Sequence, residues 1–476
     1  MLSSRWQEDG KYTANYRGCQ FRPGVAPLRR YVIIKASLPD PDSKILFMRL
    51  FWSAIYNFAV FPLIRVFVPL HALFNAKTRA SLRGRRGLWA RLDQALAGRR
   101  SGPLAWFHVA SAGEYLQAMP VIQRLSADGI QCVLSLTSVS GYRWALRQQE
   151  QEPLLLGVEY LPLDSRRNMR RWLSRVRPDI LVLVKFDLWP NMIWQTHRRH
   201  IPIFLISATL HPRSFRIRNA WARSFYRHVY ASLQAIYAVT EDDAMRFRRS
   251  NPEHRGIKAV GDTRYDSVLD RRDGIPPPDL GRWPEQSRVM VCGSTWPGDE
   301  RVLIPAMVRF LQDMSDLRCI WVPHEVDEAH LQSLERALAG VSSRRWTAWH
   351  AGGKAVAPRV LIVDTVGQLS SLYHAAHLAY VGGGFGRGVH NVMEPGAMGV
   401  PVIVGPFYQN SPEAEALISS GAGYAITDET ELSTVMASLL ADEKFRVEKG
   451  RQAARFIEQQ AGASDQCAQR VREFLA

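Results

Sequence analysis

Glu114 is the first residue of the chain whose type and position suit catalysis. It lies in FHVASAGEYLQ at 107–117, which runs from an apolar strand through a turn at Gly113 into a helix. Ligands of parallel α/β sheets bind at the carboxyl ends of strands, and the helix dipole would hold a carboxylate there ionised, as a general base requires. Ser111 and Glu114 also match a capping box, in which the glutamate only satisfies a helix-terminal amide. The segment alone leaves both interpretations open.

Two further segments bring charged side chains to predicted strand ends. KFDLWPN at 185–191 contains Lys185 and Asp187 before a rigid Trp-Pro corner, and VGDTRYD at 260–266 supplies Arg264. Either segment is also compatible with an ordinary surface loop. Lys185, Asp187 and Arg264 are therefore secondary candidates for a functional site.

Two glycine-containing turns are predicted to bind an anionic ligand. CGSTWPGDE ends a strand and starts an acidic helix, so its Ser294 and Thr295 offer hydroxyls and amides to a phosphate, although helix capping explains the same residues. GGGFGRG has five glycines within seven residues, between a strand and a helix that begins near Asn391. Glycine allows close backbone approach, which makes Gly384 and Gly386 candidate ligand contacts.

The glycine-rich loop matches neither the dinucleotide fingerprint nor the P-loop, which disfavours dinucleotide and ATP binding. His390 and Glu394 stand at i and i+4 but have no evident third ligand, and the five cysteines include no CxxC pair. The sequence therefore predicts neither a metal site nor a cofactor.

The positive charge of the chain is concentrated around one apolar run. Lys and Arg number 61 and Asp and Glu 44, a net charge of +17, of which residues 1–100 carry +13. The cations bracket Ile45–Phe74 instead of covering a folded face, so the pattern excludes a nucleic-acid-binding domain and predicts attraction to an anionic membrane surface. The run is predicted to span the membrane or lie in its interface, a buried soluble helix being the alternative. The positive-inside rule then places the rest of the chain on the cytoplasmic side.

After Ser101, short apolar runs alternate with amphipathic stretches, which predicts parallel strands joined by helices. The Pro-rich segment Gly274–Pro284 separates two such series. The predicted fold class is α/β, with two Rossmann-like domains facing a cleft and an N-terminal hydrophobic membrane-anchor helix. The predicted strands are Leu104–Ala110, Ile130–Leu136, Ile180–Val184, Ile201–Ile206 and Ala235–Val239, then Val289–Cys292, Arg318–Val322, Val360–Val363, Leu378–Val381 and Val400–Val404.

These boundaries give a predicted domain order. Residues 1–44 are expected to form a disordered extension, with Met48 as an alternative start. The parts that follow are the anchor and its basic flank at 45–100, a first domain at 101–273, a linker at 274–286, a second domain at 287–455, and a C-terminal helix at 456–476 that packs back on the N-terminal half.

Five ordered motifs resemble those of the 3-deoxy-D-manno-octulosonic acid (Kdo) transferases of lipopolysaccharide synthesis. They are SAGE at 111–114, DLWPN at 187–191, GSTWPGDE at 293–300, DTVGQLSSLY at 364–373, and VGGGFGRGVHNVMEP with GVPVIVGP. The resemblance implies a GT-B fold with an N-terminal acceptor domain and a C-terminal CMP-sugar domain. It also implies CMP-Kdo as donor, a lipid IVA-like lipid A precursor as acceptor, inversion at the anomeric carbon, no required metal, and a location on the cytoplasmic side of the inner membrane.

The resemblance also assigns roles to individual residues. Glu114 falls on the family's catalytic base, and Asn391 and Glu394 fall on its CMP-binding asparagine and glutamate. Asp364 begins the segment that lies beside the nucleotide, and His324 falls in the donor loop.

The sequence departs from the family pattern mainly on the donor side. KFD at 185–187 stands where many members have ETE, Arg264 where a lysine is common, and Gln368 where an acid is usual. The donor loop reads Pro323-His324-Glu325, so the arginine expected near the CMP phosphate is missing. These substitutions indicate a divergent branch whose donor-phosphate contacts the motifs do not define.

Two other functions remain as alternatives. One is a different GT-B nucleotide-sugar enzyme, either a UDP-sugar transferase or an epimerase. A soluble epimerase does not need the basic residues at positions 1–100, which opposes that alternative. The other is a non-catalytic membrane protein that binds a nucleotide sugar, which the presence of Glu114, Asn391 and Glu394 opposes.

Overall fold

The computed structural model of the chain describes residues 41–149, 155–280, 283–352 and 358–475, with residues 41–47 described only as part of a helix. Residues 1–40 of the expected extension at 1–44 thus lie outside the described residues. Residues from Met48 onward form one compact unit. The N-terminal elements are α1 (Pro41–Ile55), the π-helix η1 (Tyr56–Val60), α2 (Phe61–Phe74), α3 (Ala76–Gly84) and α4 (Leu88–Leu96).

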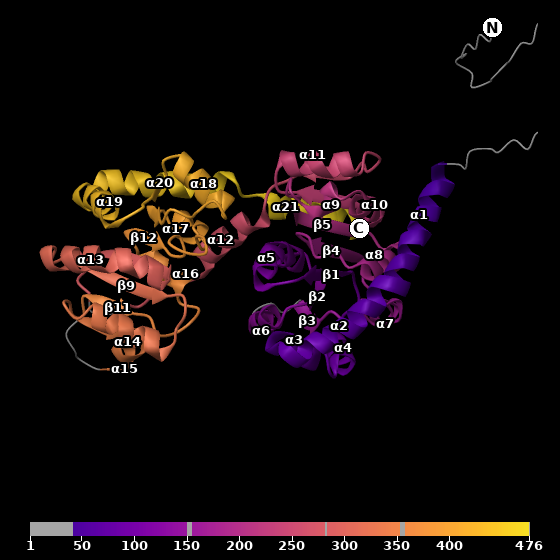
Figure 1. Cartoon of the computed structure of the whole chain (residues 1–476), viewed down its shortest axis with the longest axis horizontal. Helices are drawn as coiled ribbons and strands as arrows, with labels where there is room; N and C mark the ends of the chain where they lie inside the picture. Colours follow the sequence, from indigo (N-terminus) through magenta and orange to yellow (C-terminus); the bar gives the residue numbers. More distant parts are fainter. Residues whose placement is uncertain (1–40, 150–154, 281–282, 353–357, 476) are drawn as a thin grey trace, which may run out of the picture. The chain divides into compact units, whose positions relative to one another are not determined.

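The first domain is a parallel sheet with helices on both faces (Figure 1). Its strands are β1 (Leu104–Val109), β2 (Gln131–Leu136), β3 (Leu155–Tyr160), β4 (Ile180–Val184), β5 (Ile203–Ala208), β6 (Ala235–Ala238) and β7 (Ile257–Ala259). Its helices are α5 (Ala112–Ala127), α6 (Val139–Gln148), α7 (Arg166–Val176), α8 (Pro190–His197), α9 (Phe215–Arg218), α10 (Ala220–Tyr230), α11 (Glu241–Ser250) and α12 (Thr263–Gly274). The strand order β3-β2-β1-β4-β5-β6-β7 reverses direction between β1 and β4.

The second domain repeats this architecture. Its strands are β8 (Arg288–Thr295), β9 (Leu317–Pro323), β10 (Ser343–Arg345), β11 (Val360–Ile362), β12 (Leu378–Val381), β13 (Val402–Val404) and β14 (Gly423–Ala425), in the order β10-β11-β9-β8-β12-β13-β14. Its helices are α13 (Pro297–Asp313), α14 (Glu328–Ala337), α15 (Trp346–Ala351), α16 (Leu369–Leu372), α17 (Met393–Ala397), α18 (Pro412–Ser419), α19 (Glu429–Ala441) and α20 (Glu443–Gln459), with the 3₁₀ turn η3 (Tyr373–Ala375). The predicted fold class, two parallel α/β domains, is confirmed.

The central strands are apolar on both faces because helices cover both faces of each sheet. In β1, Leu104 and Trp106 pack toward α4, α7 and α8, whereas Ala105 and Phe107 pack toward α5. This double burial holds the carboxyl ends of β1 and β4 rigidly at the same edge of the sheet.

The C-terminal helix α21 (Ala463–Leu475) packs on the first domain, among its elements in Figure 1. Cys467 and Val471 join the core beside α5, and Phe474 meets Phe204 of β5 edge to face. Asp266 of α12 accepts hydrogen bonds from the Gly462 amide at 2.7 Å and the Ser464 amide at 2.9 Å, which fixes the start of α21. The first and the last helix of the described residues therefore both pack on the first domain.

Met48–Phe74 is the one segment in the described residues that is long and apolar enough to cross a membrane. Its inner face is attached to the domain: the Trp52 indole donates to Ser224 Oγ at 3.2 Å, and the amides of Asn57 and Asn191 exchange bonds of 3.1 and 3.0 Å. Its outer face exposes large apolar side chains, namely Leu50, Phe51, Phe58, Val60, Leu63, Val66, Phe67, Leu70, Leu73 and Phe74.

Asp164 joins this segment to the core of the first domain. Its carboxylate is buried and accepts the Tyr56 hydroxyl at 2.9 Å and the amides of Asn191 and Met192 at 2.9 and 2.8 Å. It therefore ties η1 to the start of α8.

We expect Asp164→Ala to lower the free energy of unfolding by about 2–4 kcal/mol, because three buried donors lose their acceptor. Thermal and urea unfolding in detergent measure the change. Asp93→Ala is the matched control, since the half-exposed Asp93 pairs with Arg175 at the surface and should cost less than about 1 kcal/mol. Equal losses in the two variants would contradict the role given to Asp164.

Candidate active site

The reversal of strand order between β1 and β4 brings distant residues together. β1 and β4 pair in parallel, with His108 opposite Leu183. Their carboxyl ends therefore lie side by side, and the start of α5 meets the turn that follows β4. Such switch points are the usual ligand crevices of open parallel sheets. Glu114 comes from the first of these segments, and Lys185 and Asp187 come from the second.

Glu114 lies in the first turn of α5 and is buried. Ser111 caps the helix by accepting the Glu114 amide at 3.4 Å, and the Glu114 side chain accepts the Ala110 amide through Oε2. Within the described part of the chain its other oxygen, Oε1, accepts no hydrogen bond. The side chain thus takes part in capping with one oxygen and leaves the second for a substrate.

Burial raises the pKa of Glu114 and outweighs the Ala110 amide, and the negative charge of Asp187 raises the pKa further. Desolvation of the carboxylate thus opposes the stabilisation expected at the helix terminus, and the ionised state of Glu114 stays a prediction. A raised pKa makes the ionised form a stronger base.

Asp187 accepts hydrogen bonds from two residues of the first sheet. His108 Nε2 lies 3.1 Å from Asp187 Oδ2, and the Thr137 hydroxyl lies 3.3 Å from the same oxygen. Although burial raises the pKa of Asp187, the hydrogen bonds, that of His108 foremost, prevail and lower it below its usual value. Two adjacent carboxyl groups therefore have pKa values displaced in opposite directions, an arrangement that separates a proton-accepting group from a permanently charged one.

A buried polar chain holds His108 in place. Ionised Asp187 only accepts, so His108 Nε2 carries a proton towards it, and His108 Nδ1 lies 2.8 Å from the Ser135 hydroxyl oxygen. Ser135 Oγ in turn accepts the Trp106 indole N–H at 2.8 Å. Sequence reasoning missed His108 and Ser135. The available signal was a polar residue inside each apolar strand, since a buried polar group requires a partner.

The glycine-rich loop of the second domain is shaped by Asp299, another residue that sequence reasoning did not single out. Asp299 is fully buried, and its carboxylate accepts the amides of Gly383 at 2.8 Å and Phe385 at 3.2 Å. The amides of Gly386 and Gly388 both donate to the Gly383 carbonyl at 3.0 Å. These four amides are therefore satisfied within the protein, and a contact between the loop and the donor stays a prediction.

Gly384 and Gly386 differ in how much space a side chain would have. A Cβ on Gly384 would lie 2.5 Å from the backbone nitrogen of Gly405, so packing between two backbone segments requires glycine there. A Cβ on Gly386 would meet nothing closer than 3.9 Å, and this exposed position remains a candidate ligand contact.

Three rings stack beside the loop. His324 lies 4.5 Å from the Trp296 ring and 4.4 Å from the His390 ring, and the Trp296 indole donates to His390 Nε2 at 2.9 Å. Burial, together with the neighbouring His324, lowers the pKa of His390 and keeps this ring neutral. The guanidinium of Arg387 lies 5.5 Å from the Trp296 ring centre. Of this cluster the sequence indicated His324 alone, and Arg387 supplies a cation near the donor loop that lacks its usual arginine.

A cavity of about 490 Å³ lies between the two sheet domains. Its walls come from α5, the end of β4, α12, the glycine-rich loop and the start of α18, with Gly113, Lys185, Arg264, Arg271, His390 and Asn391 among the lining residues. The cavity thus brings together Lys185, Arg264 and Asn391, which come from widely separated motifs, directly beside the turn of Glu114.

Ion pairs join the two domains around this cavity. Arg264 pairs with Asp262 at 2.8 Å and with Glu413 of α18. Arg271 pairs with Glu394 at 2.9 Å, and the Asn391 side-chain amide donates to the same Glu394 oxygen at 3.2 Å. The pairs Arg264–Glu413 and Arg271–Glu394 link α12 of the first domain to the rim of the second.

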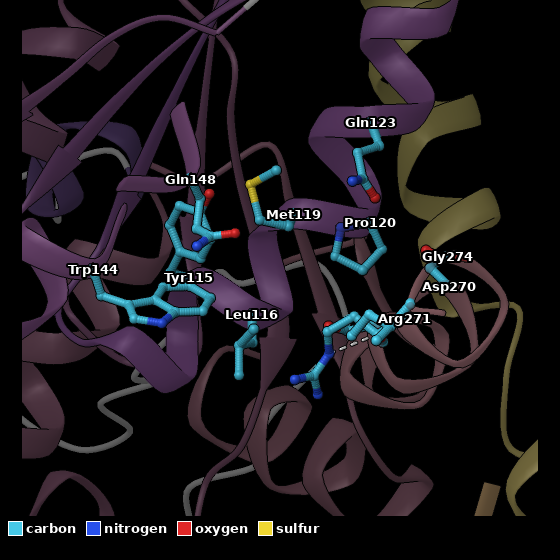
Figure 2. Close-up of a pocket in the computed structure, with 12 residues that line it drawn as sticks. Tyr115, Leu116, Met119, Pro120, Gln123, Trp144, Gln148, Asp270, Arg271 and Gly274 are labelled. Atoms are coloured by element: carbon cyan, nitrogen blue, oxygen red, sulfur yellow. Dashed lines mark hydrogen bonds between the residues drawn. The ribbon is translucent and has the colours of Figure 1, made fainter. Parts of the chain in front are cut away.

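A second cavity, of about 300 Å³, adjoins the first and shares Leu116, Ser267 and Arg271 with it. Figure 2 shows Tyr115 and Met119 of α5 on one side and Arg271 of α12 on the other. Tyr115 meets Trp144 edge to face at 4.8 Å. The crevice therefore continues along α5 away from Glu114.

The remaining predicted residues lie outside the lining of the 490 Å³ cavity. Thr295 is buried and bonds to Glu300 at 2.9 Å and Trp321 at 3.0 Å, and Asp364 accepts the Thr347 amide at 3.0 Å at the start of α15. The Thr295 hydroxyl is thus bonded inside the domain, and its contact with a donor stays a prediction. Ser294 has a left-handed φ of 54°, a strained conformation that recurs at functional sites.

Comparisons with known proteins find similar sequences among Kdo transferases. The model of the 3-deoxy-D-manno-octulosonic-acid transferase (kdotransferase) family matches residues 81–267, which include Glu114 and Asp187. The 3-deoxy-D-manno-octulosonic acid transferase of Bordetella pertussis is 28% identical over 439 residues, 87% of this chain and 98% of that protein. The one from Chlamydophila psittaci is 28% identical over 387 residues, 79% of this chain and 86% of that protein. Residues 81–267 thus match the Kdo transferase family, and most of the chain is similar to Kdo transferases.

The chain is a glycosyltransferase, and its fold is of the GT-B type. A putative UDP-N-acetylglucosamine 2-epimerase from Listeria monocytogenes has a TM-score of 0.54 at 13% identity, covering 77% of this chain and 94% of that one. A glycosyltransferase from Rickettsia africae has a TM-score of 0.53 at 12% identity, covering 79% and 99%. Likeness at these identities concerns the fold alone.

Asp187→Asn should move the acid limb of the pH profile of kcat/KM to lower pH. The substitution removes a negative charge that raises the pKa of Glu114, and Glu114 must be ionised to accept a proton. We expect a shift of up to about one pH unit. Thr137→Val is the control, because it removes one hydrogen bond but keeps the charge. An unmoved limb would contradict the coupling, and loss of activity at every pH would make Asp187 itself the base.

Proposed function

We propose that the chain transfers Kdo from CMP-Kdo to a lipid A precursor at the cytoplasmic face of the inner membrane, with inversion of the anomeric configuration. The observation that carries the proposal is the position of Glu114, a buried carboxyl with a raised pKa and one unbonded oxygen. It stands at the switch point of the first sheet, beside the cavity between the domains.

The proposed base acts in a single displacement. Glu114 takes the proton of an acceptor hydroxyl while the acceptor oxygen forms a bond to the anomeric carbon of Kdo. The bond from that carbon to the CMP phosphate oxygen breaks, and its electron pair leaves with CMP. Because the attacking and leaving groups lie on opposite faces of the sugar, the configuration inverts.

The donor is proposed to bind against the second domain. Asn391 and Glu394 are assigned to the nucleotide, and Arg271 helps to hold Glu394 in place. CMP-Kdo carries a phosphodiester and a carboxylate, and the cations available for them are Lys185 at the cavity wall and Arg387 beside the stacked rings. Charge that grows on the departing phosphate would be stabilised by such fixed cations. Ser294, His324, Asp364 and Gly386 remain proposed neighbours of the donor.

The acceptor is proposed to arrive from the membrane. The segment Met48–Phe74 exposes a continuous apolar face, but Asn57, near its middle, is hydrogen-bonded to Asn191 of the first domain. A helix fastened to a folded domain at its midpoint cannot place that point at the centre of a bilayer. We therefore infer that it lies in the interface, with exposed cations such as Lys77, Arg83 and Arg86 toward anionic headgroups.

Glu114→Gln separates catalysis from capping. An amide still accepts the Ala110 N–H, so we expect the melting temperature to stay within a few degrees and CMP binding to persist. An amide cannot take up a proton at neutral pH, so the rate of Kdo transfer should fall ~10²–10⁴-fold.

Ser111→Ala is the matched control, since it removes the cap and keeps the carboxylate. It should cost about 1 kcal/mol of stability and little rate. Retention of more than a tenth of wild-type turnover by Glu114→Gln would return Glu114 to a purely structural role.

A further inference from the structure

An apolar groove lies where the membrane-facing segment meets the first domain. It has a volume of about 220 Å³, and most of its lining residues are apolar, the polar ones being Ser81, Arg85, Thr137 and Asp164. One wall is formed by Phe61, Ile64 and Val68 of α2, and the opposite wall includes Leu82 of α3 and Leu163 in the loop after β3. No residue that we have placed at the donor site lines it.

The groove connects the exposed face of α2 with the edge of the active site. Its outer wall belongs to the segment that exposes Val66, Phe67 and Leu70. Its inner end is lined by Thr137 and Trp189, and the Thr137 hydroxyl lies 3.3 Å from Asp187. A lipid with its acyl chain in the groove would therefore have the headgroup end of that chain beside the residues around Glu114.

The groove also has a basic end. The Arg85 guanidinium donates to the carbonyls of Leu161 at 2.9 Å and Thr137 at 3.4 Å, which fixes this cation at the lining. A neighbouring cavity of about 260 Å³ shares Leu82 and Arg85 with the groove and adds the exposed Arg86. A mainly apolar groove with Arg85 in its lining and Arg86 in the adjoining cavity is complementary to a lipid with an acyl chain and a phosphate.

We propose that this groove binds one acyl chain of the lipid acceptor and that Arg85 and Arg86 face a phosphate of the same molecule. The proposal rests on the proposed function and adds a subsite for the acceptor. The proposed ligand is the acceptor and not bulk phospholipid, because Thr137 at the inner end of the groove contacts Asp187. Only a lipid that reacts at the site needs to bind next to this residue.

The test compares Val68→Trp with Val66→Trp. Both place an indole on α2, but Val68 lines the groove whereas Val66 is 64% exposed and does not. Transfer from CMP-Kdo is measured in mixed micelles with the tetraacylated acceptor and in solution with its fully deacylated disaccharide bisphosphate. Val68→Trp should raise KM for the acylated acceptor at least tenfold and leave kcat/KM for the deacylated one unchanged, while Val66→Trp should resemble wild type with both. Equal behaviour of the two variants with the acylated acceptor would overturn the proposal.

Photolabelling tests the same groove in the unaltered protein. A tetraacylated acceptor with a diazirine on one acyl chain should label peptides that contain Leu82 or Leu163, and unlabelled acceptor should compete. Labelling confined to the exposed face of α2, or groove labelling by a diazirine phospholipid that the acceptor does not displace, would overturn the proposal. Wild-type protein that transfers Kdo to neither acceptor would instead refute the proposed function.

Discussion

Glu114 and Asp187 follow neighbouring strands of the first sheet. Their carboxyl groups would repel each other if both were charged. The parallel pairing of β1 with β4 forces Glu114 and Asp187 into one crevice. His108 and Thr137 stabilise the charge on Asp187, and this leaves Glu114 as the group whose proton affinity is raised. The Trp106–Ser135–His108 chain fixes the imidazole from below, so the difference between the two carboxyl groups is built into the sheet and does not depend on a mobile loop.

The second domain uses a buried carboxylate in a comparable way. Asp299 does not face the cavity but holds the amides of the glycine-rich loop, so that the loop presents the ring stack and Arg387 instead of bare amides. Ion pairs from Arg264 and Arg271 then fasten α12 to this side of the second domain. Charged groups at the border of the cavity are therefore already paired with one another. A ligand that binds there must replace some of these ion pairs with contacts of its own.

The sequence predicts the central strands well and the edges poorly. Strands such as ILVLV at 180–184 are buried on both faces and read as continuous apolar runs. The four strands that were missed, β3, β7, β10 and β14, are the edge strands of the two sheets, and three of them have only three residues. In β3 the buried Glu159 interrupts the run, and it is tolerated because Arg91 of α4 pairs with it at 2.7 Å. At the site, Glu114 and Asn391 follow from motifs, whereas the direction of the Glu114 pKa and the inward turn of Thr295 depend on tertiary packing that no local pattern encodes.

One face of the N-terminal segment is fastened to the first domain and the other exposes apolar side chains, which is the arrangement that the proposed transfer to a lipid requires. The most direct test of the account is product analysis by mass spectrometry after full-length protein is incubated with CMP-Kdo and a tetraacylated lipid A precursor, with parallel reactions that supply UDP-sugars. The account predicts lipid products heavier by whole Kdo residues, formed only with CMP-Kdo. Unmodified lipid with CMP-Kdo, or sugar transfer from a UDP donor, would contradict it.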